Sequence, residues 1–278
     1  MLKFNAETAD PDVIAQELLH GKGAVLLTGL FSDAQVAEAR QIIHAHSEAA
    51  DKVTHFQGQA EVDGRLNLQR RVWNLLAKGD VFADMATHPV IMNVLRRFLG
   101  TEFIMGSIAA NRILPGGPGQ EPHVDYPYWD MYRAETHPIG LNASFPMNAQ
   151  VSILLDPFTA ETGATAYVPG SQKDLRYPTE ADDFYGNCER MLGEPGDVAL
   201  FFGAAWHCAM PNTSDIDRSA VLINYAPKWL TPIEEMYDAL PTGFLESASD
   251  SLRQLLGQNY PHPQSFDAAV ARNTIGRK

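Results

Sequence analysis

The stretch Gln120-Glu121-Pro122-His123-Val124-Asp125 sets the expectations for this chain, and it follows a glycine-rich turn at 115–119. In an extended strand, side chains two positions apart point to the same face, so His123 and Asp125 face one point while Val124 faces the other way. An imidazole and a carboxylate that converge in this way are two of the three protein ligands of a 2-His-1-carboxylate iron site. The third ligand would be a histidine from a distant strand, and His207 is the candidate.

His207 follows a turn at 194–197 and an apolar run at 198–202, which places it at the rim of an expected sheet. There it could face a cavity. Taken alone, each histidine also fits a structural role: His123 bonded to the neighbouring Asp125, and His207 as a hydrogen-bonded core histidine. The metal site is therefore a hypothesis that depends on the rest of the sequence.

Arg218 lies eleven residues after His207 and begins the apolar run 219–225. An unpaired charge is costly to bury, so a cation at the start of a buried strand needs a partner. A guanidinium presents a planar fork that matches a carboxylate with two parallel hydrogen bonds. The alternative is a structural salt bridge with Asp215 or Asp217.

The composition limits the class of protein. At 278 residues the chain can hold one large domain or at most two small ones, and 45% hydrophobic residues is ordinary for a globular protein. No apolar run reaches 18 residues, and the first residues lack the features of a signal peptide. Cys188 and Cys208 form no CxxC pair, which fits a reducing cytoplasm. A net charge of −13 disfavours nucleic acid and anionic membranes, so we expect a small-molecule substrate, with a homodimer left open.

The first hundred residues are expected to be mainly helical. Caps and apolar periodicity predict helices at 10–21, 32–50, 81–86 and 89–99, and a buried strand at 23–30. Short apolar runs separated by turn residues then predict the strands Phe103–Leu114, Asn148–Asp156, Thr165–Val168, Val198–Phe202 and Ser219–Tyr225. This spacing is typical of a sandwich or barrel.

We expect one domain over residues 1–278. Helical support would occupy about 1–100, the β core about 101–230, and a helix near 245–256 with a tail the remaining 231–278. Two long irregular segments, 126–146 and 173–190, interrupt the β core. Loops of this length in a compact domain are usually lids or binding loops.

Several motifs, in this order, resemble the phytanoyl-CoA dioxygenase (PhyH) family. They are Gln120-x-x-His123-x-Asp125, Glu161-Thr162-Gly163-Ala164-Thr165-x-x-Val168-Pro169-Gly170-Ser171, Gly196-Asp197, His207 and Arg218. The resemblance covers about residues 103–227 and implies a mainly β fold with flanking helices, built on a double-stranded β-helix, or jelly roll. That family comprises Fe(II)- and 2-oxoglutarate-dependent oxygenases, which also use O2.

Carried over by position, the resemblance implies roles for six residues. His123, Asp125 and His207 match the iron ligands, Arg218 matches the arginine that binds the distal carboxylate of 2-oxoglutarate, and Gln120 and Thr165 match positions that contact the cosubstrate. The chain departs from the family at Gln172, where a histidine usually follows Pro-Gly-Ser. Asp125 is present, whereas relatives that halogenate carry a small residue there, so the resemblance implies oxygenation.

The implied reaction oxidises, most simply hydroxylates, an unactivated C–H bond of a small, partly apolar metabolite, and specialised-metabolite biosynthesis fits. Desaturation, epoxidation and endoperoxide formation stay open. A different class, a cupin-type isomerase or small-ligand binding module, would not need the carboxylate clamp at Arg218.

The segment that directly follows Asp125 is the candidate substrate wall, because chain connectivity keeps it near the metal. Its members are Tyr126, Tyr128, Trp129, Tyr132 and Arg133. Aromatic side chains suit an apolar or ring-containing substrate, although a lid packed on itself is an equal alternative. Trp206 should point away from the side on which His207 lies.

Overall fold

The computed structural model describes residues 1–48, 54–55, 68–133, 135 and 145–259. Its largest element is an eight-stranded mixed sheet in the order β1-β2-β9-β6-β11-β5-β4-β3. These strands are β1 (Leu2–Asn5), β2 (Ala24–Thr28), β3 (Thr54–His55), β4 (Gln69–Val72), β5 (Phe103–Ile113), β6 (Ala149–Leu154), β9 (Val198–Phe201) and β11 (Arg218–Pro227). β1 pairs with β2 in parallel, and the other pairs are antiparallel.

A smaller sheet contains β10 (His207–Cys208), β7 (Ala166–Tyr167) and β8 (Glu189–Arg190) in that order. The segment 120–125 runs antiparallel along the free side of β10. His123 and His207 exchange backbone hydrogen bonds of 2.9 and 3.0 Å, and Asp125 donates its N–H to Gly203 at 2.8 Å. The stretch from Gln120 to Asp125 thus lies along the edge of the small sheet.

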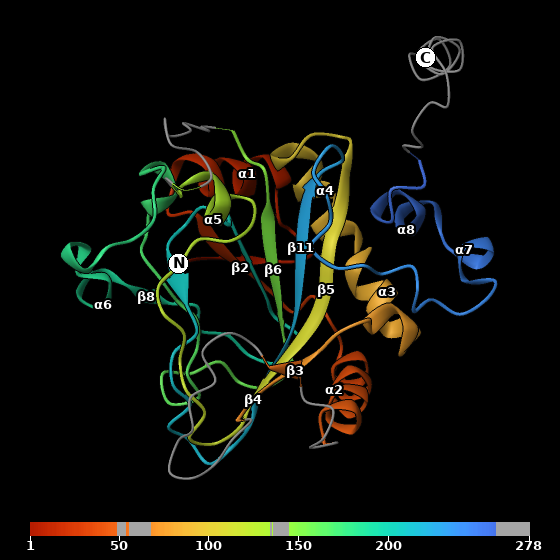
Figure 1. The fold of residues 1–278 in the computed structure, drawn as a ribbon, viewed down its shortest axis with the longest axis horizontal. Helices are drawn as coiled ribbons and strands as arrows, with labels where there is room; N and C mark the ends of the chain where they lie inside the picture. Colours follow the sequence, from red (N-terminus) through yellow and green to blue (C-terminus); the bar gives the residue numbers. More distant parts are fainter. Residues whose placement is uncertain (49–53, 56–67, 134, 136–144, 260–278) are drawn as a thin grey trace.

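Helices surround the two sheets (Figure 1). They are α1 (Pro11–His20), α2 (Asp33–Ser47), α3 (Asp80–Ala86), α4 (Pro89–Phe98), α5 (Tyr128–Met131), α6 (Phe184–Asn187), α7 (Phe244–Ser247) and α8 (Asp250–Leu255), with short 3-10 turns at Leu75–Ala77, Ser171–Lys173 and Glu180–Asp182. The helices α1, α2 and α8 contact strands of the large sheet, whereas α6 lies beside β8 of the small sheet (Figure 1). Among the helices of these described stretches, none is long and apolar enough to cross a membrane.

The predicted helix starts in the N-terminal part are confirmed. Asp10 caps α1 through its side chain, and Ser32 with Gln35 forms the expected capping box on α2. The single helix expected near 245–256 is wrong in detail, because the structure has two short helices there. Ser249 lies between them and accepts the backbone N–H of Leu252, which starts α8 as a separate helix.

The five strands predicted after residue 102 are all present, within two residues of the expected bounds. Five strands have no counterpart among the predicted ranges: β1, β3, β4, β8 and β10. β3 and β4 lie in the polar stretch 53–72, where no alternation of apolar residues marks a strand. β4 is a strand because it pairs with β5 over four residues, a long-range contact that its own sequence does not signal.

Side chains of the central strands alternate between two environments. On β11, Val221, Ile223 and Tyr225 join the main hydrophobic core beneath the helices. The alternate residues of the strand line a cavity on the opposite face; they are Arg218, Ala220, Leu222 and Asn224. A strand with period-two alternation therefore separates the supporting core from the functional site.

Asn148, fully buried just before β6, links two segments that approach the cavity. Its amide oxygen accepts the backbone N–H of Gly203 at 2.9 Å, and its amide nitrogen donates to the carbonyl of Tyr126. A side chain on Gly203 would collide with this amide, because a Cβ there would lie 2.1 Å from it. Asn148 therefore holds the residue after Asp125 next to the loop that leads to His207.

We expect Asn148→Ala to lower the free energy of unfolding by about 2–4 kcal/mol, because it leaves the buried N–H of Gly203 and the partly buried carbonyl of Tyr126 without this partner. Urea denaturation measures the change. Asn187→Ala is the matched control: its exposed amide also donates to two backbone carbonyls, and its loss should cost less than about 1 kcal/mol. Equal losses in the two variants would contradict this role of Asn148.

Candidate metal centre and cosubstrate pocket

His123, Asp125 and His207 meet at one point. Asp125 Oδ2 lies 3.2 Å from His207 Nε2, and Asp125 Oδ1 lies 3.8 Å from His123 Nε2. One potential ligand atom from each residue lies within 4.8 Å of the other two. Among the described residues, this is the one group of three or more His, Cys, Asp or Glu side chains with metal-binding geometry.

The second ring nitrogen of each histidine contacts a backbone carbonyl. His123 Nδ1 is 2.7 Å from the carbonyl oxygen of Glu121, and His207 Nδ1 is 2.9 Å from that of Ala205. A carbonyl only accepts, so Nδ1 carries the proton and donates it, which leaves the lone pair of each imidazole on Nε2. Two lone pairs and a carboxylate then face one another, and a cation satisfies all three.

The electrostatics fit this state at His123 and Asp125, whereas at His207 they favour a proton shared with Asp125 when no metal is bound. Burial and the neighbouring His207 lower the pKa of His123 to about 4, so that imidazole is neutral. Burial opposes ionisation of Asp125, but the two imidazoles and Arg71 outweigh it and lower the pKa of the carboxyl. Burial also opposes protonation of His207, yet the carboxylate of Asp125 raises its pKa. A carboxylate and a neutral imidazole are the forms that bind a metal.

Arg218 begins β11 with only 5% of its surface exposed. Its guanidinium lies 4.8 Å from the centre of the Phe158 ring, and neither Nε nor Nη2 has a hydrogen-bond partner within the described part of the chain. Burial lowers the pKa of Arg218 to about 10. The alternative salt bridge is absent from these residues: Asp217 instead pairs with Arg112 at 2.6 Å.

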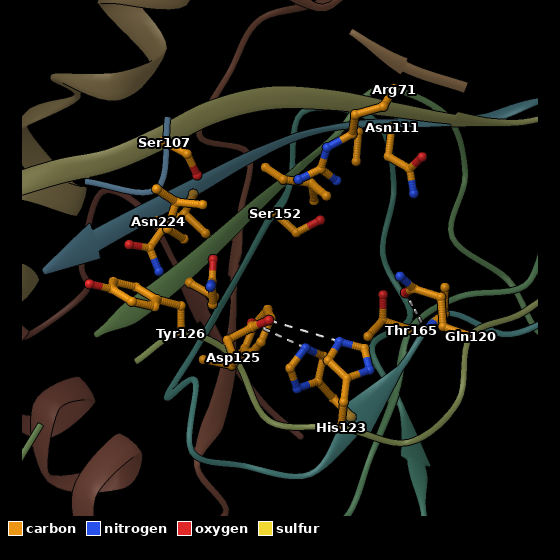
Figure 2. Close-up of a pocket in the computed structure, with 18 of the residues that line it drawn as sticks. Arg71, Ser107, Asn111, Gln120, His123, Asp125, Tyr126, Ser152, Thr165 and Asn224 are labelled. Atoms are coloured by element: carbon orange, nitrogen blue, oxygen red, sulfur yellow. Dashed lines mark hydrogen bonds and ion pairs between the residues drawn. The ribbon is translucent and has the colours of Figure 1, made fainter. Parts of the chain in front are cut away.

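A cavity of about 160 Å³ opens between the two sheets. It is lined by Arg71, Trp73, Ser107, Asn111, Gln120, His123, Asp125, Tyr126, Trp129, Gln150, Val151, Ser152, Thr165, Phe201, His207, Ala209, Arg218, Ala220, Leu222, Asn224 and Ile233. Figure 2 shows the imidazole of His123 and the carboxylate of Asp125 on one side of this space, with polar side chains of the large sheet across from them. The cavity therefore contains both the triad and Arg218.

Four further predicted site residues also line the cavity. Gln120 and Thr165 lie together on the side of the triad away from Tyr126 (Figure 2). The amide oxygen of Gln120 accepts the backbone N–H of Ala209 at 3.2 Å, which orients the side chain. Tyr126 and Trp129 form part of the wall, and their rings pack edge to face at 5.9 Å.

The structure places the other three predicted wall residues outside the cavity lining. Tyr128 is fully buried: its hydroxyl donates to the carbonyl of Phe145 and accepts the N–H of Met147 at 2.7 Å. Tyr132 packs against Tyr128 with ring centres 5.7 Å apart, and Arg133 is exposed. The reason is the helical turn α5, which directs positions four apart to one face, here the core.

Sequence reasoning missed most of the cavity wall on the large sheet. Arg71, Trp73, Ser107, Asn111 and Asn224 all line it. Ser107, Asn111 and Asn224 are polar residues within otherwise apolar strands, and that pattern could have identified them. Arg71 lies in β4 and Trp73 directly follows it, and the residue pattern there carries no strand signal.

Arg71 approaches the triad from the opposite wall (Figure 2). Its guanidinium stacks 4.9 Å from the centre of the Trp73 ring. Burial lowers the pKa of Arg71 to about 10, while the carboxylates of Asp125 and Glu234 act in the opposite direction. The cavity thus contains two arginines, one near the triad and one at the start of β11.

Trp206 and Gln172 both lie outside the cavity lining. Trp206 points away from the cavity, as expected, and its indole N–H donates to the carbonyl of Arg176 at 2.9 Å. Gln172, the departure from the family pattern, is buried and donates to the carbonyls of Leu18 and Gly21. Its role here is to hold the end of α1.

The family match and the relatives found by sequence comparison agree with one another. Residues 19–220 match the phytanoyl-CoA dioxygenase (PhyH) family. The dioxygenase hkm4 of Aspergillus hancockii is 30% identical over 247 residues, covering 84% of this chain and 77% of that protein. The dioxygenase cdmD of Talaromyces verruculosus is 26% identical over 271 residues, covering 92% and 86%. The match to dioxygenase af480 of Aspergillus fumigatus is 24% identical and spans 59% of that protein.

Solved structures share the fold. The non-heme alpha-ketoglutarate-dependent carbocyclase SnoK from nogalamycin biosynthesis superposes with a TM-score of 0.61 at 20% identity, covering 81% of this chain and 87% of that one. HygX from Streptomyces hygroscopicus, solved with nickel and 2-oxoglutarate bound, gives 0.58 at 15% identity, covering 81% and 90%. With these matches beside its His-Asp-His triad, the chain belongs to the phytanoyl-CoA dioxygenase family, whose members are Fe(II)- and 2-oxoglutarate-dependent dioxygenases.

Proposed function

We propose that His123, Asp125 and His207 hold Fe(II) and that the two facing sheets form the jelly roll of the family. The observation that carries this proposal is the donor set: the Nε2 atoms of two histidines and one carboxylate converge, while both Nδ1 atoms face backbone carbonyls. This donor set fits ferrous iron, and three protein ligands leave positions free for a cosubstrate and dioxygen.

The cosubstrate 2-oxoglutarate is a dicarboxylate, and the two arginines of the cavity suit its two ends. Arg71 reaches toward the triad from the opposite wall, so it would pair with the carboxylate next to the 2-oxo group (Figure 2). Arg218 has two guanidinium nitrogens without partners and would bind the distal carboxylate through its planar fork. Gln120 and Thr165 line the same side of the cavity as hydrogen-bonding neighbours.

When bound, iron and 2-oxoglutarate supply the oxidising chemistry, in which dioxygen is consumed and the cosubstrate becomes succinate and carbon dioxide. The residues of this chain bind and orient. The carbonyls of Glu121 and Ala205 fix the two imidazole rings, Asp125 provides the negative charge, and the arginines hold the diacid. The aromatic pair Tyr126 and Trp129 restricts water and places a substrate carbon beside the metal.

The reaction we propose is hydroxylation of an unactivated C–H bond in a small, partly apolar metabolite. The cavity wall supports an organic substrate, because aromatic and aliphatic side chains such as Trp73, Trp129, Leu222 and Ile233 lie among its polar groups. The relatives hkm4, cdmD and af480 are dioxygenases of filamentous fungi, and SnoK acts in nogalamycin biosynthesis, which supports a role in specialised metabolism. Desaturation, epoxidation and endoperoxide formation would use the same site.

Asp125→Ala should abolish succinate formation and lower the affinity for Fe(II) by at least about tenfold, because it removes the one anionic ligand. Equilibrium dialysis measures metal binding, and circular dichroism verifies folding. Asp215→Ala, at an exposed position outside the cavity, is the matched control and should bind iron normally. Normal iron binding by Asp125→Ala would contradict the ligand assignment.

Arg218→Leu should weaken 2-oxoglutarate binding about 10- to 100-fold, because it removes hydrogen bonds to a charged carboxylate. The probe 2-oxopentanoate, which lacks the distal carboxylate, separates the two arginines. Its affinity should be unchanged by Arg218→Leu and lowered by Arg71→Leu. Arg133→Leu, at an exposed position, is the control for both ligands. Equal effects of Arg218→Leu on both ligands would overturn the assignment of Arg218 to the distal end.

A further inference from the structure

The pairing of β5 with β11 is interrupted where these strands border the cavity. Asn224 lies opposite Ser107, but the next residue, Tyr225, lies opposite Met105, so Gly106 has no partner in the ladder. This is a β-bulge, a device that re-aims side chains and is frequent beside active sites. The carbonyl of Gly106 accepts the N–H groups of Ile233 and Glu234 at 2.8 and 3.0 Å. The bulge therefore holds the chain after β11 across one end of the cavity, where Ile233 lines it.

The absence of a side chain at Gly106 makes room for the amide of Asn224. A Cβ at Gly106 would lie 2.3 Å from Asn224 Oδ1, closer than real contacts allow. Any other residue at position 106 would therefore displace this amide. The bulge and its glycine together place an asparagine side chain where a regular strand pair would not accommodate it.

Among the neutral polar side chains that line the described cavity, Asn224 has the most buried polar atoms without a hydrogen-bond partner. It is 2% exposed, yet neither Oδ1 nor Nδ2 has a hydrogen-bond partner among the residues that the structure describes. Leaving a buried amide unsatisfied costs about 1–3 kcal/mol, and both of its polar atoms are in this state. A purely structural asparagine would be bonded to its neighbours, as Asn148 is.

The surroundings of Asn224 differ from those of the arginines. Figure 2 shows Asn224 beside Ser107 and Tyr126 at one end of the cavity, with Gln120 and Thr165 at the other. Leu222 on the same strand and Ile233 above the bulge add apolar surface. Gln150, the cross-strand neighbour of Asn224, adds a second amide, and Tyr126 and Ser107 bring hydroxyl groups. The polar groups named at this end are therefore all uncharged.

We propose that Asn224, assisted by Ser107, binds an uncharged carboxamide of the substrate, such as a lactam within a ring system. This inference rests on the proposed function and names the substrate class of the same site. A primary amide side chain offers one acceptor and two donors, and a lactam presents an N–H and a carbonyl side by side as its complement. The apolar residues around it receive the rings.

Charge complementarity disfavours an anionic group at this end. Asn224 and Ser107 carry no charge, and both arginines of the cavity are assigned to 2-oxoglutarate. A carboxylate or phosphate buried against an amide would keep most of its desolvation cost. The acidic net charge of −13 also repels polyanions such as a coenzyme A ester at long range.

The test compares three bicyclic probes of similar shape: 2-quinolinone, a lactam; coumarin, which has the acceptor but no donor; and naphthalene, which has neither. Binding is measured by equilibrium dialysis against the anaerobic protein loaded with Fe(II) and 2-oxoglutarate. We expect 2-quinolinone to bind at least about tenfold more tightly than naphthalene, with coumarin between them. Asn224→Leu should reduce this ratio to about one, and Ser107→Ala should reduce it partially.

Asn93→Leu is the control, because it makes the same change at an exposed helical position and should leave the preference for the lactam intact. Binding of 2-oxoglutarate by each variant shows that the site is folded. If the wild-type protein binds 2-oxoglutarate but shows no lactam preference, or if Asn224→Leu keeps that preference, the inference is overturned while the proposed function stands. Failure of the wild-type protein to bind 2-oxoglutarate would instead overturn the proposed function.

Discussion

Three hydrogen-bond acceptors that face one another within 4.8 Å impose the central constraint on this structure. Without a cation, Asp125 repels two imidazole lone pairs, and only one shared proton can relieve part of that repulsion. The carbonyls of Glu121 and Ala205 make the arrangement rigid, because they hold both Nδ1 protons outside the centre. A site that is electrostatically unfavourable when empty gains the more from a divalent ion.

Backbone hydrogen bonds hold His123 beside His207, although the two residues are 84 positions apart in the sequence. The segment 120–125 and the chain from Gly203 to Ala209 run antiparallel, and they bond at Gln120, His123 and Asp125. His123 and His207 are directly opposite each other in this ladder, so their rings lie on the same face at a fixed separation, with centres 4.4 Å apart. Beyond Asp125, the side chain of Asn148 links the two segments once more, because it bonds both the carbonyl of Tyr126 and the N–H of Gly203.

The sequence predicted the parts of this site that depend on local pattern. The i, i+2 spacing of His123 and Asp125, the turn before β9 and the apolar run of β11 each signal their own geometry. The position of Arg71 depends instead on β4 pairing with β5 forty residues later, and the polar stretch before it carries no such signal. Tyr128 and Trp129 are adjacent and alike in chemistry, yet the short helix α5 sends one into the core and the other to the cavity. Residue type alone does not distinguish them.

The whole chain is strongly acidic, whereas the cavity is lined by two arginines, Arg71 and Arg218. Fixed charges beyond about 8–10 Å are screened by salt, so the net charge of −13 acts on approaching molecules rather than on bound ones. Within the cavity, Arg71 and Arg218 lose hydration on burial, which lowers the pKa of each to about 10. On the proposed function, the two carboxylates of 2-oxoglutarate would offset that loss. With both cations assigned to the cosubstrate, the remaining wall from Asn224 to Tyr126 is neutral. Selection of the substrate there has to come from shape and from neutral hydrogen bonds, because an anion in that position would have no counter-charge.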